Sequence, residues 1–559
     1  MGIDLGTTNS LITCFIDGEL TVIPNVLGEN LTPSVVSIAD DGQIFVGKIA
    51  KERLVSHPDK TASVFKRSMG TKKEFNLGSQ TFTAEELSSF VIKRLKEDAE
   101  VYLGEEITEA VISVPAYFND TQRRATKLAG ELAGLKVERI VNEPTAASLA
   151  YGIHEKADYT KYLVFDLGGG TFDVSVLEKY NNIMEVRAVA GDVFLGGEDF
   201  SKILEEMFIH KANIEVDELS NLEKAVMRKS VETAKHNFEK NATVKISMVL
   251  KGETIEADVT LAEYTKECEF LLDRLRQSIK ISMSDAKISL NQIDNVILAG
   301  GATRLPVVKN FVSKLFRRLP FATIDPDEVV GVGAAVHAGL KERNTALSEM
   351  ILTDVCPFTL GVETASKQTN GLYYYDLYTP IIERNTVIPV SRVERFSTLR
   401  EEQSSVHIRV YQGENRKASE NSLLGELSVN VPKAPAGAEA VDVRFTYNIN
   451  GILEVEVRVV SSGLQKTIVI DKNPGVFTQE EIEQKLSELA EYKIHPREKE
   501  ENRLLLSRGE RMYQESLGDM RIAIGKELTE FEVVLDSQDN RKIRDHAVRL
   551  KNFLESIEG

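Results

Sequence analysis

Hydrophobic and polar residues change their spacing along this chain. From residue 1 to about 345, short apolar runs alternate with amphipathic segments, which predicts an α/β fold with largely covered sheets. Between about 355 and 472 the period becomes two, as in residues 406–411 and 453–459, which predicts an antiparallel β region. The pair Asn450-Gly451 stands between two such runs and favours a tight hairpin turn.

The last part of the chain has the spacing of charged helices. Thr478 and Glu481 match a capping box, and Ile482, Leu486 and Leu489 then recur at helical intervals to form one apolar stripe. We therefore expect a short helical region at the end of the chain.

A short segment between the α/β part and the β region is more apolar than a solvated linker. Residues 348–354 place Met350, Ile351 and Leu352 between acidic side chains. The segment is either a linker that is covered part of the time or an edge strand of the β region, and the spacing alone favours neither.

Length and composition limit the class of protein. At 559 residues the chain is expected to form two to four domains, and its hydrophobic fraction of 42% and charged fraction of 28% are ordinary for a globular protein. No apolar run reaches membrane-spanning length, and the start at residues 1–4 has neither a basic patch nor an apolar leader, so a cytoplasmic location is expected. A net charge of -18 argues against nucleic-acid or membrane binding.

The cysteines and histidines indicate no dedicated metal or redox chemistry. Cys14, Cys268 and Cys356 lie far apart without the spacing of a zinc or redox motif, and are predicted to be small buried apolar side chains. The eight histidines are scattered, so a histidine metal site or a Ser/His/Asp triad has no support from the sequence.

A repeat inside the α/β half points to a phosphate site. Residues 2–8 (GIDLGTT) and 164–171 (VFDLGGGT) both combine a strand, the triplet Asp-Leu-Gly and a threonine. Glycines let backbone amides approach a phosphate closely, hydroxyls add donors, and an aspartate at the strand end can hold magnesium through its water ligands. One such turn is usually a plain hairpin, but two on the halves of a duplicated region predict a clamp around one polyphosphate.

A third strand and turn is predicted to lie at the nucleoside end. Residues 295–306 end in the pair Gly300-Gly301 followed by Arg304, whose planar side chain can stack on a base. The alternative is a helix entry with a structural glycine pair. Neither a Walker P-loop nor a kinase glycine loop with its partner motifs is present.

Together these strings resemble the 70-kilodalton heat-shock (DnaK-type) chaperones nearly end to end. The motifs that carry the resemblance are residues 2–10 (GIDLGTTNS), 114–120 (VPAYFND), 142–147 (NEPTAA), 166–173 (DLGGGTFD) and 196–200 (GGEDF). The resemblance implies an actin/hexokinase-like two-lobed ATPase domain at 1–345, a linker at 346–354, a β-sandwich peptide-binding domain at 355–474 and an α-helical lid at 475–559.

The resemblance also implies ATP or ADP as ligand, with Mg²⁺ and nearby K⁺, and assigns roles to side chains. Hydrated magnesium is expected at Asp4, Glu143 and Asp166. Lys66 matches the catalytic lysine, whereas without the resemblance it reads as a surface lysine. Glu143 and Thr171 are expected to position the attacking water, with Asp173 in support. The phosphate-binding residues implied are Gly6, Thr7, Thr8, Asn9, Gly168, Gly169, Gly170, Gly196, Gly197 and Glu198.

For the nucleoside, the family pattern points to Glu232, Lys235, His236, Gly300, Gly301, Arg304 and Asp327. Two of its positions depart from better known members: His236 stands where they have arginine, and Glu239 where they have serine. Base affinity is therefore expected to differ from theirs.

Other matching positions imply coupling and partners. Pro115, Arg123, Leu352 and Asp354 match positions that relay the nucleotide state. Arg139, Asn119 and Asp120 match a docking surface for a J-domain cochaperone, although as polar residues they also suit a solvated surface. Unfolded or extended client polypeptides are the other expected partner.

The resemblance places the peptide groove on Val362, Phe396, Val406, Ile408 and Val441, with an arch of Ala365 and Leu399. Spacing alone makes these an ordinary sandwich core. If residues 350–352 dock on the ATPase lobes only in the ATP state, hydrolysis releases the linker and lets the β domain and lid close on a peptide, and the coupling is reciprocal.

Three departures suggest a specialised bacterial, HscC-like branch. The first strand starts almost at the phosphate loop, the region 199–288 is short where exchange factors usually bind, and the tail lacks a terminal acidic tetrapeptide. Nucleotide exchange is therefore expected to be intrinsic.

Three other functions are compatible with parts of the sequence. A non-cycling relative that acts as a holdase or exchange factor is opposed by the presence of Lys66, Glu143, Asp166 and Thr171. A sugar kinase on the same fold has no use for the region after residue 355, and an actin-like filament protein would polymerise with nucleotide.

Overall fold

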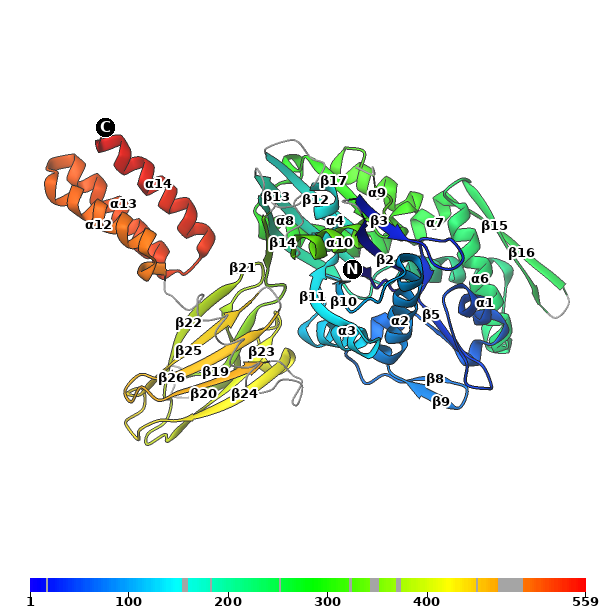
Figure 1. The fold of residues 1–559 in the computed structure, drawn as a ribbon, viewed down its shortest axis with the longest axis horizontal. Coiled ribbons are helices and arrows are strands. Elements are labelled where there is room, and N and C mark those ends of the chain that lie inside the picture. The colour runs from blue at the N-terminus through cyan, green and yellow to red at the C-terminus, as the bar shows by residue number, and fades with distance from the viewer. Residues whose placement is uncertain are drawn as a thin grey trace. The chain divides into compact units, whose positions relative to one another are not determined.

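The computed structural model divides into two compact units, Met1–Thr353 and Asp354–Gly559 (Figure 1). It describes residues 1–16, 19–152, 159–180, 183–250, 253–320, 324–341, 351–367, 373–448, 451–470 and 496–558. The predicted turn residue Asn450, the capping box at Thr478 and Glu481, the stripe of Ile482, Leu486 and Leu489, and Met350 lie outside these ranges.

The first unit is built on two sheets with the same strand arrangement. The first has the order β11-β10-β1-β2-β3, in which β1 pairs parallel with β10 and antiparallel with β2. In the second, β12 pairs parallel with β17 and antiparallel with β13, which in turn pairs antiparallel with β14. The strands are β1 (Gly2–Asp4), β2 (Asn9–Ile16), β3 (Glu19–Ile23), β4 (Thr32–Pro33), β10 (Glu109–Val114), β11 (Lys136–Asn142), β12 (Tyr159–Leu167), β13 (Phe172–Tyr180), β14 (Ile183–Asp192) and β17 (Asn295–Ala299).

This duplication places the two predicted phosphate motifs at equivalent turns, after β1 and after β12. The turns connect antiparallel neighbours, so Asp4 and Asp166 occupy corresponding strand ends. The α/β prediction for this part of the chain is confirmed.

Helices cover the sheets of the first unit, coloured blue to green in Figure 1. Helix α10 packs on β1, β2 and α4, while α8 packs on β13 and β14. A Cβ on Gly333 of α10 would lie 1.8 Å from the Ala146 carbonyl oxygen of α4, so only glycine permits this crossing. The helices are α1 (Lys48–Ser56), α2 (Ala84–Leu103), α3 (Asp120–Leu132), α4 (Glu143–Gly152), α5 (Gly197–Ala212), α6 (Asn221–Asn237), α7 (Leu261–Glu267), α8 (Glu269–Ala286), α9 (Pro306–Phe316) and α10 (Val329–Lys341).

Helix α2 shows how local signals set these elements. Thr83 and Glu86 form a reciprocal capping box at its start, and Gly104 ends it with φ 75°. Between them Leu87, Val91 and other residues form a buried stripe. Smaller elements complete the unit: β5 (Val35–Ile38), β6 (Ile44–Val46), β7 (Thr61–Ser63), β8 (Phe75–Leu77), β9 (Gln80–Phe82), β15 (Thr243–Leu250), β16 (Glu253–Thr260), and the 3-10 turns η1 (Pro58–Lys60), η2 (Phe65–Ser68), η3 (Val216–Glu218), η4 (Leu290–Gln292) and η5 (Gly301–Arg304).

The second unit begins with a β-sandwich of two four-stranded antiparallel sheets, ordered β20-β19-β23-β24 and β22-β25-β26-β27. The predicted hairpin is confirmed, because β25 and β26 pair antiparallel and Gly451 between them has φ 78°. The elements are β19 (Leu360–Lys367), β20 (Tyr373–Ile382), β21 (Val387–Ile388), β22 (Val390–Ser397), β23 (Ser405–Gln412), η6 (Ala418–Glu420), β24 (Ser422–Asn430), β25 (Ala440–Tyr447), β26 (Leu453–Val459) and β27 (Gln465–Ile470).

Three helices follow in the second unit, drawn in orange to red in Figure 1. They are α12 (Glu500–Glu515), α13 (Gly518–Asp536) and α14 (Asn540–Glu558), preceded by the turn η8 (Pro496–Glu498). Ile524, Phe531 and Leu550 are among the buried residues of their shared apolar core. The predicted helical end of the chain is confirmed for these residues.

The apolar segment before the β region forms a strand whose pairing partner changes between Thr353 and Asp354. Strand β18 (Ile351–Val355) pairs in parallel through residues 351–353 with Ile183, Met184 and Glu185 of β14, in the first unit. In the second unit, Asp354 and Val355 pair with β21. Residues 351–353 therefore extend the second sheet of the α/β unit, and the next two residues begin the β region.

Candidate functional site

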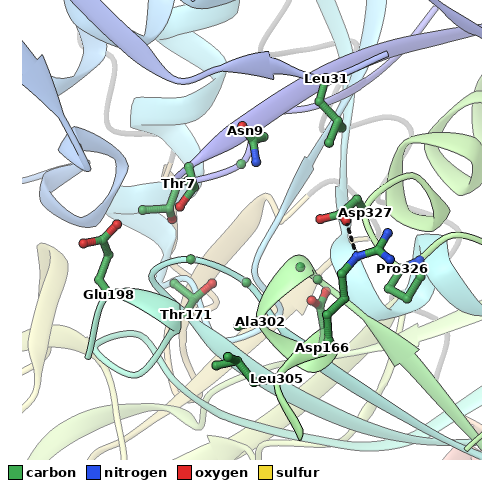
Figure 2. Close-up of a pocket in the computed structure, with 18 of the residues that line it drawn as sticks. Thr7, Asn9, Leu31, Asp166, Thr171, Glu198, Ala302, Leu305, Pro326 and Asp327 are labelled. Atoms are coloured by element: carbon green, nitrogen blue, oxygen red, sulfur yellow. Dashed lines mark hydrogen bonds and ion pairs between the residues drawn. The ribbon is translucent and has the colours of Figure 1, made fainter. Parts of the chain in front are cut away.

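A cavity of about 500 Å³ lies in the α/β unit and collects most of the predicted nucleotide residues. Figure 2 shows Thr7 and Asn9 on one side, with Asp166 and Thr171 facing them from the other. Its size is ordinary for a small-molecule site. The predicted residues that line it are Asp4, Gly6, Thr7, Thr8, Asn9, Lys66, Glu143, Asp166, Gly168, Gly169, Thr171, Gly197, Glu198, Glu232, Lys235, His236, Gly300, Gly301, Arg304 and Asp327.

The loop between β1 and β2 is held from behind by hydroxyl groups. The Gly6 amide donates to Ser10 Oγ (3.1 Å), and Ser34 Oγ donates to the Gly6 carbonyl (2.8 Å). Thr8 Oγ1 is buried and has no hydrogen-bond partner among the described residues. A buried donor without a partner favours a polar ligand at this loop.

The loop between β12 and β13 packs directly on the start of α5. The amides of Gly197 and Glu198 donate to the carbonyls of Gly168 and Gly169, both at 2.9 Å. A Cβ on Gly196 would lie 2.5 Å from the Gly170 nitrogen, so glycine is required there. Gly170 and Gly196 thus shape the loop although neither lines the cavity.

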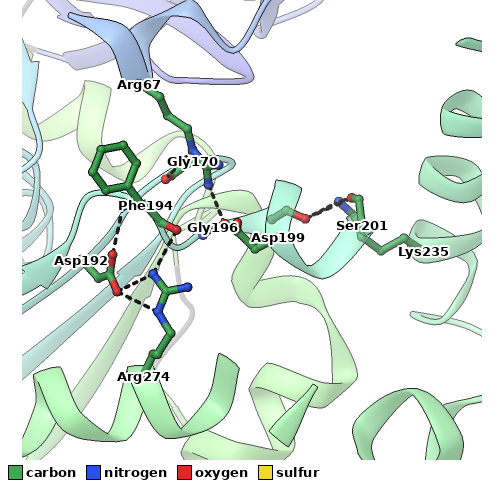
Figure 3. Close-up of polar contacts among 10 residues, drawn as sticks. Arg67, Gly170, Asp192, Phe194, Gly196, Asp199, Ser201, Lys235 and Arg274 are labelled. Carbon is green, nitrogen blue, oxygen red and sulfur yellow. Dashed lines mark hydrogen bonds and ion pairs between the residues drawn. The ribbon is translucent and has the colours of Figure 1, made fainter. Parts of the chain in front are cut away.

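Arg67 connects the first half of this unit to the second phosphate loop. Its Nε donates to the Gly170 carbonyl (2.8 Å) and its Nη2 pairs with Asp199 Oδ2 at 2.6 Å (Figure 3). The same Asp199 oxygen accepts the Gly196 amide (2.8 Å). Arg274 supports the preceding turn through Asp192. Arg67 and Asp199 were not predicted from the sequence, and nothing in their spacing indicates that they meet.

Lys66 reaches the cavity from the turn η2 and is almost completely buried. Its Nζ lies 2.7 Å from Glu143 Oε1, with the two side chains 3% and 9% exposed, and 5.6 Å from the Phe118 ring centroid. Val64, just before η2, has φ 58° and ψ 17°, a left-handed conformation that β-branched residues rarely adopt. The reading of Lys66 as a surface lysine is wrong.

Two buried aspartates, Asp166 and Asp173, and the partly buried Asp4 lie close to this ion pair. Burial, reinforced by the charge of Glu143, raises the pKa of Asp4 to about 7 and that of Asp173 to about 8. Burial also raises the pKa of Asp166, and its Oδ2 has no hydrogen-bond partner among the described residues. Carboxylates that repel one another and include an unpartnered oxygen fit a hydrated magnesium ion at Asp4, Glu143 and Asp166. Asp173 does not line the cavity, and its Oδ1 accepts the Tyr117 amide at 3.0 Å.

A second polar group lies at the predicted nucleoside end. Glu232 receives Lys235 Nζ at 2.8 Å, Ser201 Oγ at 2.6 Å and His236 Nε2 at 3.2 Å. Although burial opposes it, the hydrogen bonds from His236 and Lys235 lower the pKa of Glu232 to about 2. Across the cavity, Arg304 Nε pairs with Asp327 Oδ2 at 2.8 Å.

Four cavity residues have no signal in the sequence: Leu31, Lys51, Pro326 and Val330. They come from loops and helices that carry no recognisable motif, so only the folded chain brings them to the site. Ala302 and Leu305 line the cavity from the third predicted turn, at residues 295–306, and Glu239, at the position where better known members have serine, lines it too.

The residues predicted to relay the nucleotide state or to bind a J-domain cochaperone have mainly structural contacts. Arg123 donates to the carbonyls of Ala116 and Phe118, both at 3.0 Å, and so supports the segment after β10 that begins at the buried Pro115. Asn119 caps α3, while Asp120 pairs with Arg124 inside that helix. Arg139 lies in β11 and is partly buried. Asp354 Oδ1 accepts its neighbour's amide at Val355.

The predicted peptide-groove residues fall into two groups within the second unit. Val362, Ile408 and Val441 are fully buried in the core of the sandwich. Phe396, Val406, Ala365 and Leu399 keep partial exposure. The second group is thus the one open to a ligand in this structure.

The fold and cavity define a duplicated α/β unit whose cavity is lined by two glycine loops and acidic side chains, followed by a β-sandwich and a helical bundle. The model of the Hsp70 protein family matches residues 1–77 and 72–558, so the chain belongs to the Hsp70 family. Members of that family are ATP-dependent chaperones and ATPases that bind ATP or ADP with Mg²⁺, unfolded clients and J-domain cochaperones. No helix within the described ranges is long and apolar enough to cross a membrane.

Proposed function

We propose that this chain hydrolyses ATP to ADP and phosphate, and that its nucleotide state controls binding of extended apolar segments of unfolded proteins. The observation that carries the proposal is the buried Lys66–Glu143 pair, which lines one cavity together with both glycine loops. Burying a lysine with a carboxylate costs desolvation energy, and a structural role does not require it to face a cavity.

In this mechanism the side chains position the attacking water and stabilise negative charge on the phosphates. Magnesium, when bound at Asp4, Glu143 and Asp166, offsets charge on the phosphates. Lys66 stabilises the charge that develops on the γ-phosphate, while Glu143 and Thr171 orient the attacking water, with Asp173 behind them. Potassium near this site is part of the proposal.

The proposed coupling uses the division into ATPase domain 1–345, linker 346–354, β-sandwich 355–474 and lid 475–559. The pairing of residues 351–353 with β14 supports a linker that docks on the ATPase domain. Ala365, Phe396, Leu399 and Val406 are the proposed contacts to the client, above the core formed by Val362, Ile408 and Val441. A J-domain partner, a cytoplasmic location and an HscC-like branch complete the proposal.

Single-turnover ATP hydrolysis tests it, with wild-type protein and Thr171→Ala, with and without an unfolded apolar peptide. We expect slow hydrolysis that the peptide accelerates and that Thr171→Ala suppresses, because Thr171 lines the cavity together with Asp166. Hydrolysis that is indifferent to a broad peptide panel would instead favour a non-cycling holdase or exchange factor.

A further inference from the structure

Three consecutive tyrosines stand at the start of β20, beside the proposed peptide groove. Tyr374 and Tyr375 are 58% and 56% exposed, unusually open for large rings on a strand. The ring of Tyr375 stacks on that of Tyr373, with centroids 6.1 Å apart and an interplanar angle of 29°. An exposed stacked pair offers a ready surface for a third aromatic ring.

Tyr373 connects this pair to the other side of the groove. Its hydroxyl donates to the Leu399 carbonyl at 3.1 Å. Leu399 belongs to the segment between β22 and β23, where Gln403 Oε1 accepts the Leu399 amide at 3.0 Å. The side chain of Tyr373 therefore reaches from the edge strand β20 to a segment that is itself held in place.

The strand register places Ala365 next to the same tyrosines. Tyr373 pairs with Lys367 and Tyr374 with Ser366, and the register shifts between Thr364 and Ser366, at Ala365. Ala365 and Leu399 are the two partly exposed residues of the proposed arch. The aromatic pair is thus continuous with the proposed groove.

We infer that Tyr373 and Tyr375 form an aromatic rim of the peptide groove, which binds an aromatic side chain of an extended client segment beside its apolar core. This inference rests on the proposed function and deepens it. Tyr375 supplies the contact surface, whereas Tyr373 is a positioning residue that holds both its neighbour and the Leu399 segment. The client class selected in this way is an extended segment with phenylalanine or tyrosine next to its aliphatic residues.

The test uses the full chain with ADP and two labelled peptides of leucine and serine that differ only in one flanking residue, phenylalanine or alanine. Tyr375→Ala is expected to speed dissociation of the phenylalanine peptide about 3- to 10-fold and to leave the alanine peptide unchanged, since only the first peptide loses an aromatic contact. Tyr373→Phe removes only the hydroxyl and is expected to speed dissociation of both peptides to the same extent. Tyr180→Ala, an exposed tyrosine of the first unit, is the matched control and is expected to change neither rate.

Peptide binding at the rim can also be followed by tryptophan fluorescence, because the chain contains no tryptophan of its own. Tyr375→Trp introduces a single indole, whose emission is expected to shift when the phenylalanine peptide binds. If Tyr375→Ala affects both peptides equally, or affects neither, the aromatic rim is overturned. The proposed function still stands in that case, provided that the wild type binds the peptides. Failure of the wild type to bind either peptide overturns both.

Discussion

Lys66 and Glu143, which are 77 positions apart in the sequence, form an ion pair of 2.7 Å between side chains that are almost fully buried. The pair faces the cavity between the two glycine loops, so removing either charge affects both the chemistry and the fold. Removal of one partner leaves the other as a buried, uncompensated charge.

Lys66→Ala is expected to slow single-turnover hydrolysis by about 10²- to 10³-fold, the usual effect of losing one donor that stabilises transition-state charge. It is also expected to lower the free energy of unfolding by about 3 kcal/mol in the nucleotide-free protein, because Glu143 loses its partner. Rapid-quench kinetics and urea titration measure the two effects. Lys93→Ala, an exposed lysine on α2, is the control, and equal behaviour of the two variants contradicts the assignment.

Two aspartates with raised pKa values predict how stability changes with pH. Burial raises the pKa of Asp4 from 3.8 to about 7 and that of Asp173 from 3.8 to about 8. At a pH between 3.8 and the raised pKa of each carboxyl group, the folded chain holds a proton that the unfolded chain has released. The free energy of unfolding of the nucleotide-free protein therefore falls as the pH rises from about 4 to 8. Urea titrations across this range are expected to show a shallower fall for Asp173→Asn than for the wild type. Identical slopes for the two proteins contradict the prediction.

Gly196→Ala is expected to weaken ADP binding at least about 10-fold. Its Cβ would lie 2.5 Å from the Gly170 nitrogen, so the second phosphate loop must move. Gly425→Ala, in β24 of the second unit, is the control, because it lies outside the cavity and its Cβ would meet nothing nearer than Ile470 Cδ1 at 3.3 Å. Calorimetric titration with ADP and Mg²⁺ measures the ADP affinity of both variants. An equal loss of affinity in both would show that the close contact between Gly196 and Gly170 does not set ADP affinity.

Arg67→Lys is expected to weaken ADP binding about 3- to 10-fold, even though the charge is kept. A lysine cannot reproduce the fork that bonds both the Gly170 carbonyl and Asp199. Asp199→Asn should cause a smaller loss, since its backbone contact with Gly196 can remain. Arg395→Lys, at an exposed pair with Asp442 in the other unit, serves as the control. Full ADP affinity in Arg67→Lys would rule out this role for the fork.

Local sequence patterns predicted much of the fold. Runs of period two indicated the strands of the sandwich, and the run 453–459 is the observed β26, because alternation of side chains is a property of a single strand. The two Asp-Leu-Gly strings likewise indicated facing loops, since duplicated strands and turns carry the same residues wherever they fold.

The tertiary structure decided which side chains meet. Lys66 had no local signal beyond its resemblance to a family motif, and Arg67, Lys51 and the Tyr373 contact to Leu399 had none at all. These contacts join elements of different sheets and loops, and their geometry depends on how whole elements pack rather than on neighbouring residues. The sequence by itself determined the secondary-structure elements and the glycine turns. Only the packing of the duplicated sheets could decide the buried ion pair and the hydrogen bond from Arg67 to the Gly170 carbonyl, and only the packing of the sandwich could decide the aromatic pair beside the groove.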